Sequence, residues 1–269
     1  DGINALLDIG MDNIYSYTLQ ALHGTPYKDD EAFIKKYGYT TKYRIVPQDF
    51  TTIDNSPIFD VEEVAVATKD MSFDDYLEAR KYLLVIILCK GCFKPLELYL
   101  KQHNIQVSEW IKNIFNNLDE LPSGAQSVYQ SFVQSTIDEL WDSEEELVTY
   151  FSKSKNYQSL LNGERGSNVL FRHRIWILSA MTREWTSFVF KLTRNLVLSH
   201  TKAESHAKLE IELNSLERFV LGQVSECFTL SGLEKVTFDQ FDFDILDWMK
   251  DSNNSNLEAF SVSTPLTNK

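Results

Sequence analysis

Two cysteines and two histidines are the residues of this chain whose spacing first suggests metal or redox chemistry. Cys89 and Cys92 form a Cys-x-x-Cys pair, and Cys227 is the one further cysteine. A zinc ion or an iron–sulfur cluster generally needs about four ligands, so this set is too small. His200 and His206 are six residues apart, a spacing that does not place them on one face of a helix. We therefore interpret Cys89 as a core residue and predict neither a metal site nor a catalytic residue in this chain.

An aspartate-rich stretch at residues 74–78, Asp-Asp-Tyr-Leu-Glu, resembles the magnesium-binding motif of isoprenoid synthases. The second motif of that enzyme class needs a hydroxyl group and an acid four residues apart on a downstream helix. Ser199 is followed at that distance by Ala203, and Glu204 comes one residue too late. Both aspartates lie in the first turn of a predicted helix that Ser72 caps, and capping explains them without a metal.

Basic residues gather in one part of the chain: Arg165, Arg172, His173, Arg174 and Arg183. The planar guanidinium fork of arginine suits carboxylate and phosphate groups. The cluster either contributes to an anion-binding pocket or forms ion pairs with acidic helices, and both interpretations remain open. For the pocket interpretation, the predicted substrate-pocket residues are Arg165, Asn168 and Arg172.

The chain as a whole is acidic, with 39 Asp and Glu against 26 Lys and Arg in 269 residues, and a net charge of −13. This balance argues against non-specific binding to nucleic acid or to anionic membranes. Three cysteines cannot form a disulfide framework, and we find no signal peptide or transmembrane run, so we predict a cytoplasmic protein. The chain begins at Asp1 without a methionine, and we expect it to be a fragment or a processed product.

The elements that position these side chains are organised around residues 61–96. This stretch reads as a short strand, a helix start capped by Ser72, and a helix that is wholly apolar from Tyr82 to Cys89. Because the second half of this helix has no polar face, it must lie in the core. The apolar run is too short to cross a bilayer.

Upstream of this helix the pattern is mixed. Residues 12–20 have strand composition and follow the end of a helix, so we predict a strand in a parallel sheet, with residues 22–26 as the loop after it. That loop is either a ligand-binding loop or a plain turn, because ligands bind at the carboxyl ends of such strands. A short helix at residues 29–37 and a strand at residues 42–46, ended by Pro47, are predicted next.

Downstream of Pro95 the pattern is helical almost throughout. A capping box at Ser143 predicts a helix start, and the longest helical pattern runs from Val169 to about His200. The predicted fold is mostly α with a small α/β part. Its predicted parts are a terminal β/α piece at residues 1–37, a β connector at 38–70, a helical domain at 71–250 and a flexible tail at 251–269.

Several motifs follow one another in order over most of the chain. They are Leu7-Asp8-Ile9-Gly10-Met11-Asp12 leading to Tyr15-x-Tyr17-x-Leu19 and Leu22-x-Gly24-Thr25, then Tyr37-Gly38-Tyr39-Thr40-Thr41-Lys42-Tyr43-Arg44, Val46-Pro47-x-Asp49-Phe50, Val61-Glu62-Glu63-Val64, Met71-Ser72-Phe73-x-Asp75-Tyr76, Leu160-Leu161-Asn162-Gly163-Glu164-x-Gly166-x-Asn168-Val169-Leu170 and Phe241-Asp242-Phe243-Asp244. Together they resemble the C-terminal part of cobalamin-binding radical S-adenosylmethionine (radical SAM) enzymes.

The resemblance implies a partial TIM-like barrel in which a 4Fe–4S cluster and S-adenosylmethionine drive radical chemistry, often methyl transfer helped by cobalamin. Residues 12–26 would then be a late barrel strand and its loop. The residues that this places near the adenine of S-adenosylmethionine are Tyr17, Leu22, Gly24 and Thr25. The family's Cys-x-x-x-Cys-x-x-Cys motif is missing from this chain, as is a cobalamin-binding domain. The resemblance puts both in an upstream part of the same polypeptide.

We therefore expect a segment that closes the barrel and shapes the pocket for a small-molecule substrate, inactive and without cofactors on its own. Its expected partners are the upstream polypeptide and that substrate, and neither nucleic acid nor a membrane. The alternative is a non-catalytic helical module that binds or regulates another protein.

Overall fold

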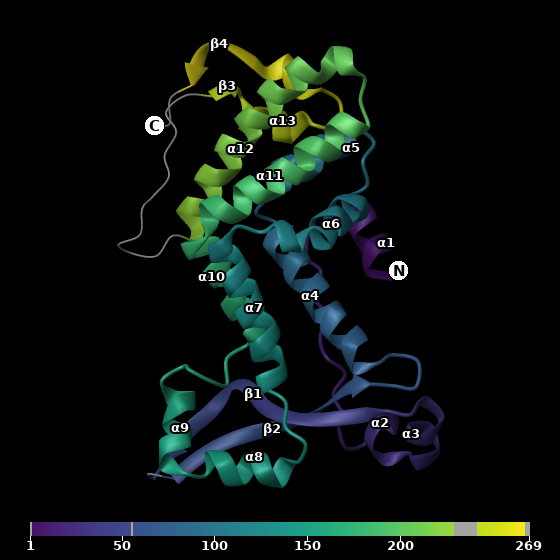
Figure 1. Ribbon diagram of the computed structural model, residues 1–269, viewed down its shortest axis with the longest axis vertical. Coiled ribbons are helices and arrows are strands. Elements are labelled where there is room, and N and C mark those ends of the chain that lie inside the picture. Colours follow the sequence, from purple (N-terminus) through teal and green to yellow (C-terminus); the bar gives the residue numbers. More distant parts are fainter. Residues whose placement is uncertain (1, 55, 229–240, 267–269) are drawn as a thin grey trace. The chain divides into compact units, whose positions relative to one another are not determined.

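The computed structural model describes residues 2–54, 56–228 and 241–266. Helices account for most of them, and the strands form two two-stranded antiparallel sheets (Figure 1). The chain divides into two compact units, which we call the sheet unit (residues 15–83 and 129–173) and the helical unit (residues 1–14, 84–128 and 174–269). The prediction of a mostly helical fold with a small sheet is confirmed. Within the described ranges, the strands do not form a barrel.

The sheet unit is built on a long antiparallel hairpin of β1 (Thr40–Ile53) and β2 (Ser56–Ala67). We predicted that the first of these strands ends at Pro47, but it continues to Ile53. The register shifts between Ile45 and Phe50, and Gln48 there adopts a φ of 65°. Proline has no N–H to donate to a ladder, and an irregular stretch of this kind accommodates it without ending the strand.

One face of the hairpin carries a hydrophobic core cluster. Its buried members are Ile45, Leu147, Phe151, Tyr157 and Leu160. The last four come from α8 (Glu144–Phe151) and α9 (Ser154–Leu161), which lie against β1 in Figure 1. Ser143 Oγ accepts a hydrogen bond from the Glu146 N–H at 3.1 Å, which confirms the predicted start of α8.

The segment predicted as a parallel strand, residues 12–20, forms no regular strand in the structure. Its end instead runs antiparallel to β2, where Gln20 bridges Val64 and the Ala65 N–H donates to the Leu19 carbonyl at 2.8 Å. Because β1 occupies one edge of β2, residues 19–21 pair with the other edge of β2. The predicted parallel pairing is therefore wrong where this segment meets β2.

Two short helices follow in the sheet unit, α2 (Pro26–Asp29) and α3 (Glu31–Tyr37). The Asp30 side chain caps α3 by accepting from the Phe33 N–H at 3.0 Å, and Gly38 ends the helix in the left-handed conformation. The predicted short helix in this region is thus confirmed, with its end at the predicted glycine.

Helix α4 (Phe73–Cys89) begins in the sheet unit and ends in the helical unit. Ser72 and Asp75 cap it reciprocally: the Asp75 N–H donates to Ser72 Oγ at 3.1 Å, and the Ser72 N–H donates to Asp75 Oδ2 at 2.8 Å. Near its start, Tyr76 packs with Val64 and Val66 of β2. The predicted capped start is confirmed. So is the buried second half, in which Leu84 is fully buried and Ile87 only partly.

The helical unit contains most of the remaining elements. They are α1 (Gly2–Asp8), α5 (Lys94–Gln102), α6 (Val107–Asn116), η1 (Leu118–Glu120), α11 (Thr182–Ser199), η2 (Ala203–Ser205), α12 (His206–Phe228), β3 (Phe241–Phe243), α13 (Ile245–Asp251), η3 (Leu257–Phe260) and β4 (Ser261–Leu266). Helices α11 and α12 pack along each other (Figure 1). Trp110 of α6 is buried and donates its indole N–H to Thr193 Oγ1 of α11 at 2.8 Å.

Two further helices have residues in both units, as α4 does. They are α7 (Ser123–Asp138) and α10 (Val169–Ala180). The predicted single helix from Val169 to about His200 is wrong, because it divides into α10 and α11. Met181 adopts non-helical angles at the break, and Thr182 Oγ1 donates back to the Leu178 carbonyl at 2.6 Å.

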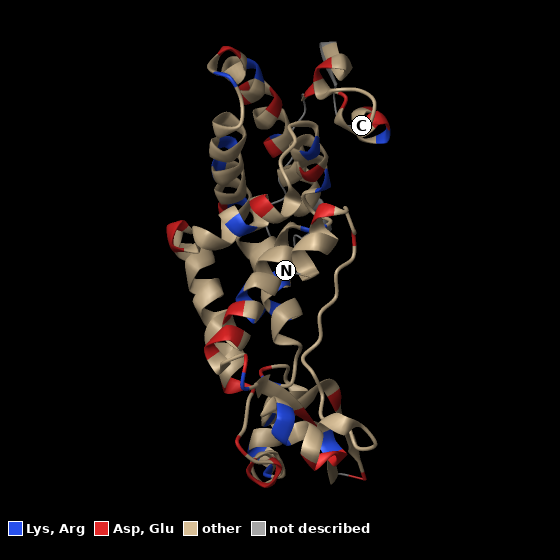
Figure 2. Cartoon of the chain, turned by 90° about the vertical axis from the view of Figure 1, so that its right-hand side faces the viewer, with Lys and Arg blue, Asp and Glu red and all other residues tan. Residues whose placement is uncertain are grey.

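The predicted flexible tail from residue 251 contains η3 and β4, and β4 pairs with β3. Figure 2 shows acidic and basic residues interspersed along the helices of each unit. In residues 2–54, 56–228 and 241–266, no helix combines the length and apolar character that crossing a membrane requires.

Candidate functional site

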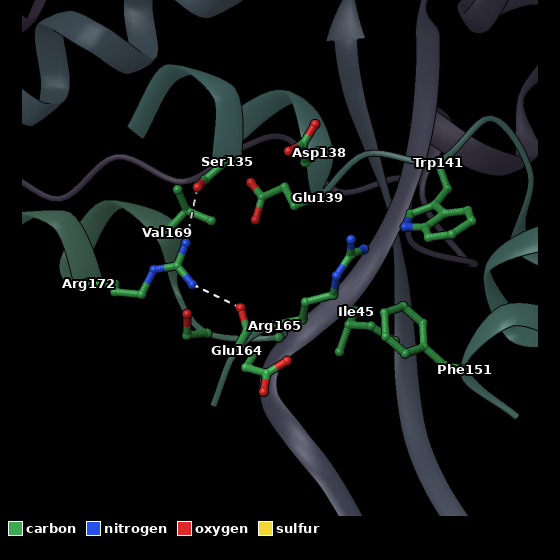
Figure 3. Close-up of a pocket in the computed structure, with 12 residues that line it drawn as sticks. Ile45, Ser135, Asp138, Glu139, Trp141, Phe151, Glu164, Arg165, Val169 and Arg172 are labelled. Atoms are coloured by element: carbon green, nitrogen blue, oxygen red, sulfur yellow. Dashed lines mark hydrogen bonds between the residues drawn. The ribbon is translucent and has the colours of Figure 1, made fainter. Parts of the chain in front are cut away.

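A cavity of about 230 Å³ lies in the sheet unit beside the loop of residues 162–168, and we call it the arginine cavity (Figure 3). Residues of β1, α7, α8 and α10, and of the connection between α7 and α8, complete its walls. The lining residues are Ile45, Ser135, Asp138, Glu139, Trp141, Phe151, Glu164, Arg165, Gly166, Ser167, Val169 and Arg172. It therefore combines cationic, anionic and hydroxyl groups with an apolar wall.

The backbone of the 162–168 loop explains how its side chains reach the cavity. Gly166 has a φ of 69°, and a Cβ on it would lie 2.7 Å from Phe50 Cε1, so this position requires glycine. Its carbonyl accepts a hydrogen bond from the Gln48 N–H at 2.8 Å, which fixes the loop to the irregular part of β1. The Arg165 N–H donates to the Ser159 carbonyl at 3.0 Å and anchors the loop to α9.

The two arginines of the cavity differ in how they are held. Arg172 donates from Nη2 to Ser135 Oγ at 3.1 Å and from Nη1 to the Glu164 carbonyl at 3.2 Å (Figure 3). Arg165 instead lies over the Tyr150 ring, 5.6 Å from its centroid. Its guanidinium forms neither an ion pair nor a hydrogen bond with a described residue. Arg172 is thus fixed by protein groups, whereas Arg165 retains its donors for a ligand.

The third predicted pocket residue, Asn168, has a different position. Its Oδ1 accepts from the Phe171 N–H at 3.2 Å, so it caps α10, and it does not line the cavity. The remaining members of the predicted basic cluster, His173, Arg174 and Arg183, are not among the residues that line the cavity. Arg174 donates from Nε to the Ile87 carbonyl at 2.7 Å, and His173 Nδ1 lies 2.7 Å from the Val169 carbonyl oxygen.

Glu139 connects the cavity to a buried group of charges. Its Oε1 accepts from Arg44 Nη1 at 2.9 Å and lies 3.9 Å from Arg80 Nη2. Arg44 also donates from Nε to Glu62 Oε1 at 2.6 Å. Burial raises the pKa of Glu139, and the two arginines oppose this effect only in part. Together, Arg44, Glu62, Arg80 and Glu139 form what we call the charge network.

The arrangement can bind a ligand. Arg165 offers free donors, and Asp138 and Glu164 offer acceptors, beside the apolar wall of Trp141 and Phe151. Such a cavity can recognise a small molecule that carries an anionic group next to an apolar part.

The residues predicted to lie near S-adenosylmethionine do not share one cavity. Tyr17 lines a second, smaller cavity of the sheet unit, which we call the tyrosine cavity, whereas Leu22, Gly24 and Thr25 form a closed turn elsewhere. Thr25 Oγ1 donates to the Leu22 carbonyl at 2.6 Å, and the Gly24 N–H donates to Asp29. The contacts of residues 22–25 are those of a plain turn, one of the two interpretations left open by the sequence.

The candidate metal ligands each have other surroundings. Cys89 is fully buried, and burial raises the pKa of its thiol, which agrees with the core interpretation. His200 Nε2 lies 3.0 Å from Glu109 Oε1, whereas His206 Nε2 lies 3.3 Å from the Thr201 carbonyl oxygen. No group of three or more His, Cys, Asp or Glu side chains suited to a metal occurs among the residues that the structure describes. Cys227 lies outside the described side chains.

Sequence reasoning missed the charge network. Arg44 lies between Tyr43 and Ile45, two residues that contribute to the core cluster, and a charge in such a strand indicates a buried partner. Its partner Glu139 is 95 residues away in the sequence, so the pair itself could not be predicted.

No protein-family model matches this chain, and no curated protein matches it. A function must therefore be inferred from the side chains of the sheet unit and from the resemblance of the sequence motifs.

Proposed function

We propose that this chain is the C-terminal part of a radical SAM enzyme of the cobalamin-dependent type, and that it shapes the substrate pocket and closes the barrel. One observation carries this proposal: two of the stretches that resemble the family contact each other, residues 46–50 and residues 160–170, and the second of them lines the arginine cavity. The Gln48 N–H to Gly166 carbonyl bond and the packing of Phe50 on Gly166 join them. Motifs more than 100 residues apart in the sequence are thus in contact, and one of them supports the loop that lines the cavity.

The exposed segment at residues 15–18 is a second support. Tyr15 and Tyr17 are 67% and 87% exposed, although their composition is that of a strand. An extended, apolar stretch with a free edge invites pairing with another strand. In this proposal, residues 15–18 meet the barrel part of the same polypeptide.

Within the pocket, Arg165 binds an anionic group of the substrate. Arg172, held by Ser135 and the Glu164 carbonyl, keeps the 162–168 loop in place around it. Trp141 and Phe151 exclude water from the apolar part of the substrate. The substrate is a small molecule whose identity these side chains leave open.

The cofactors of the family do not fit the residues described here. Cys89 is a buried thiol with a raised pKa, and Cys92 accepts from Arg174 Nη2 at 3.8 Å, so the pair is no cluster site. In this proposal the 4Fe–4S cluster and cobalamin are held by another part of the polypeptide. S-adenosylmethionine is held there too, with Tyr17 as the one predicted adenine residue that lines a cavity.

The coding sequence upstream of Asp1 tests the proposal directly. We expect a Cys-x-x-x-Cys-x-x-Cys motif there, and the longer polypeptide should retain an iron–sulfur cluster after anaerobic reconstitution with iron and sulfide. Visible absorbance measures the cluster, and the matched control is the longer polypeptide with its three motif cysteines changed to alanine. A stop codon or an unrelated domain upstream would contradict the proposal.

The exposed Tyr15 and Tyr17 also favour a second candidate function, a non-catalytic module that binds or regulates another protein. The same reading of the coding sequence separates the two, because this candidate requires no cysteine motif upstream. Stoichiometric cluster retention by the present chain, lost on Cys89→Ser or Cys92→Ser, would contradict both interpretations.

A further inference from the structure

A cavity of about 270 Å³ lies in the helical unit, and we call it the glutamate cavity. Helices α5 and α12, η3 and the connection from α11 to α12 form its walls. Its lining residues include Tyr99, His103, Lys202, Lys208, Leu209 and Glu212. The cavity thus combines one carboxylate with two ammonium groups and two aromatic rings.

Glu212 of α12 offers the cavity a buried acceptor that a ligand can reach. Its side chain is 4% exposed, and its Oε2 accepts a hydrogen bond from Tyr99 Oη at 2.7 Å, which fixes the carboxylate. Its Oε1 accepts no hydrogen bond from a described residue. Unlike Glu97 Oε1, this oxygen is not sealed from solvent. A molecule in the cavity can therefore donate a hydrogen bond to Glu212 Oε1.

The charge of Glu212 indicates which donor suits it. The carboxylate forms no ion pair with a described residue, and Lys208, whose charge acts on it, is itself paired with Glu258. Burial raises the pKa of Glu212, and the Tyr99 hydrogen bond and Lys208 oppose this effect only in part. A buried carboxylate without a counter-ion is costly, and a cationic donor compensates it better than a neutral one. An ammonium group is therefore the donor that suits this site.

The other side chains of the wall indicate what accompanies the ammonium group. Lys202 forms neither an ion pair nor a hydrogen bond with a described residue, so its ammonium group is available to an anion. Together with Lys208 it opposes a second cation in the ligand. Burial and the charge of Lys208 lower the pKa of His103, so this ring is neutral at neutral pH and adds no charge. It packs on Tyr99 with 4.5 Å between the ring centroids, and Leu209 adds an apolar surface.

We propose that the glutamate cavity binds an α-amino acid with an apolar side chain. The ammonium group of the ligand donates to Glu212 Oε1, its carboxylate accepts from Lys202 Nζ, and its side chain lies against Leu209 and the His103 ring. A polyamine would bring a second cation to two lysines, and an uncharged sugar would leave Glu212 without a counter-charge. This site is separate from the arginine cavity and does not depend on the proposed function.

L-Leucine is the probe, and two analogues are its matched controls. Isopentylamine lacks the carboxylate of leucine, and isocaproate lacks its ammonium group. Titration calorimetry on the full chain at neutral pH should give a Kd for each analogue at least about tenfold above that of L-leucine, as for one lost hydrogen bond to a charged group. Binding of isopentylamine or spermidine as tight as that of L-leucine would overturn the proposal, as would the absence of binding by both L-leucine and L-alanine.

Histidine-ring NMR locates the bound ligand. The chain has five histidines, of which His103 lines this cavity. Its signals are assigned from their loss in His103→Gln. We expect L-leucine to shift the His103 resonances in preference to those of the other four. A shift confined to the other histidines would place the ligand elsewhere and contradict the proposal.

Two variants separate the two ends of the ligand. Lys202→Met changes an exposed side chain, so it should unfold at the wild-type temperature, raise the Kd for L-leucine about tenfold and leave that for isopentylamine unchanged. Glu212→Gln keeps an acceptor for Tyr99 Oη and removes the charge, so it should raise the Kd for both molecules.

The control proteins carry the same replacements outside the cavity. They are Lys191→Met, at an exposed ion pair with Glu120, and Glu217→Gln, which lies on α12 and pairs with Arg194. Both should keep the wild-type Kd for L-leucine. If Lys202→Met also keeps it, or if Lys191→Met raises it equally, the assigned contacts are wrong.

Discussion

Arg44→Met is the substitution that most sharply tests the charge network of the sheet unit. Methionine keeps most of the aliphatic volume of Arg44 and removes its guanidinium. Two hydrogen bonds to carboxylates are lost, one to Glu62 at 2.6 Å and one to Glu139 at 2.9 Å. The side chains of all three residues are at most 15% exposed. The variant therefore leaves two carboxylates buried with one fewer cation.

The expected cost follows from these contacts. Hydrogen bonds to charged groups contribute about 1.5–3 kcal/mol each, so two of them give about 3–6 kcal/mol. Arg80 still lies 3.9 Å from Glu139, and Gln20 still donates to Glu62, which reduces the loss. We expect a decrease of about 3–5 kcal/mol in the free energy of unfolding at pH 7, the range for removal of one partner from a buried ion pair.

The loss should also depend on pH in a defined direction. Burial raises the pKa of Glu139 in the folded protein, and Arg44 is one of the groups that oppose this effect. Without Arg44 the pKa of Glu139 rises further above its unfolded value. A carboxyl group of this kind binds its proton more tightly in the folded state, so it favours folding at low pH and loses that contribution as pH rises through its folded pKa. The difference between wild type and Arg44→Met should therefore be largest at neutral pH and shrink toward about pH 5.

Urea unfolding followed by circular dichroism at several pH values measures both effects. Lys191→Met is the control, because it breaks an exposed ion pair to Glu120 and should cost less than about 1 kcal/mol at every pH. An Arg44→Met protein within about 1 kcal/mol of wild type, or one whose deficit grows toward pH 5, would refute the reasoning.

Four further substitutions test α4, its cap and the loop at the arginine cavity, each measured by the same urea unfolding. Leu84→Ala should cost about 2–5 kcal/mol because Leu84 is fully buried, and Ile87→Ala should cost less because Ile87 is only partly buried; equal costs would contradict the described packing. Ser72→Ala should cost about 0.5–2 kcal/mol through the lost helix cap, and a neutral result would show that the cap is dispensable. Gly166→Ala should cost more than about 1 kcal/mol, because its φ of 69° and the contact with Phe50 both oppose a Cβ, and wild-type stability would contradict the loop geometry.

Local signals in the sequence predicted the local structure well. Ser72 and Ser143 start helices as predicted, because a cap depends on residues three positions away. The run from Tyr82 to Cys89 predicted a buried helix from its composition alone. The break between α10 and α11 was missed, since neither glycine nor proline marks Met181.

Pairings between distant segments could not be predicted. Residues 12–20 have strand composition, but the direction of pairing was decided by the free edge of β2 at Val64. At the candidate site, Arg165 and Arg172 were predicted from the chemistry of arginine, and both line the cavity. Asn168 was predicted with them, although its position before α10 is that of a cap. The charge network required a contact between Arg44 and Glu139 that no local pattern indicates.

The irregular part of β1 determines which face of the hairpin Phe50 occupies. Ile45 pairs with Val61 and Phe50 pairs with Phe59, so β1 advances five residues where β2 advances two. The surplus is odd, and both Ile45 and Phe50 consequently face the same core cluster, although side chains five positions apart in a regular strand point to opposite faces. A regular strand of the same length would turn Phe50 away from Gly166, so the irregular stretch is what keeps both the core cluster and the loop at the arginine cavity in contact with β1.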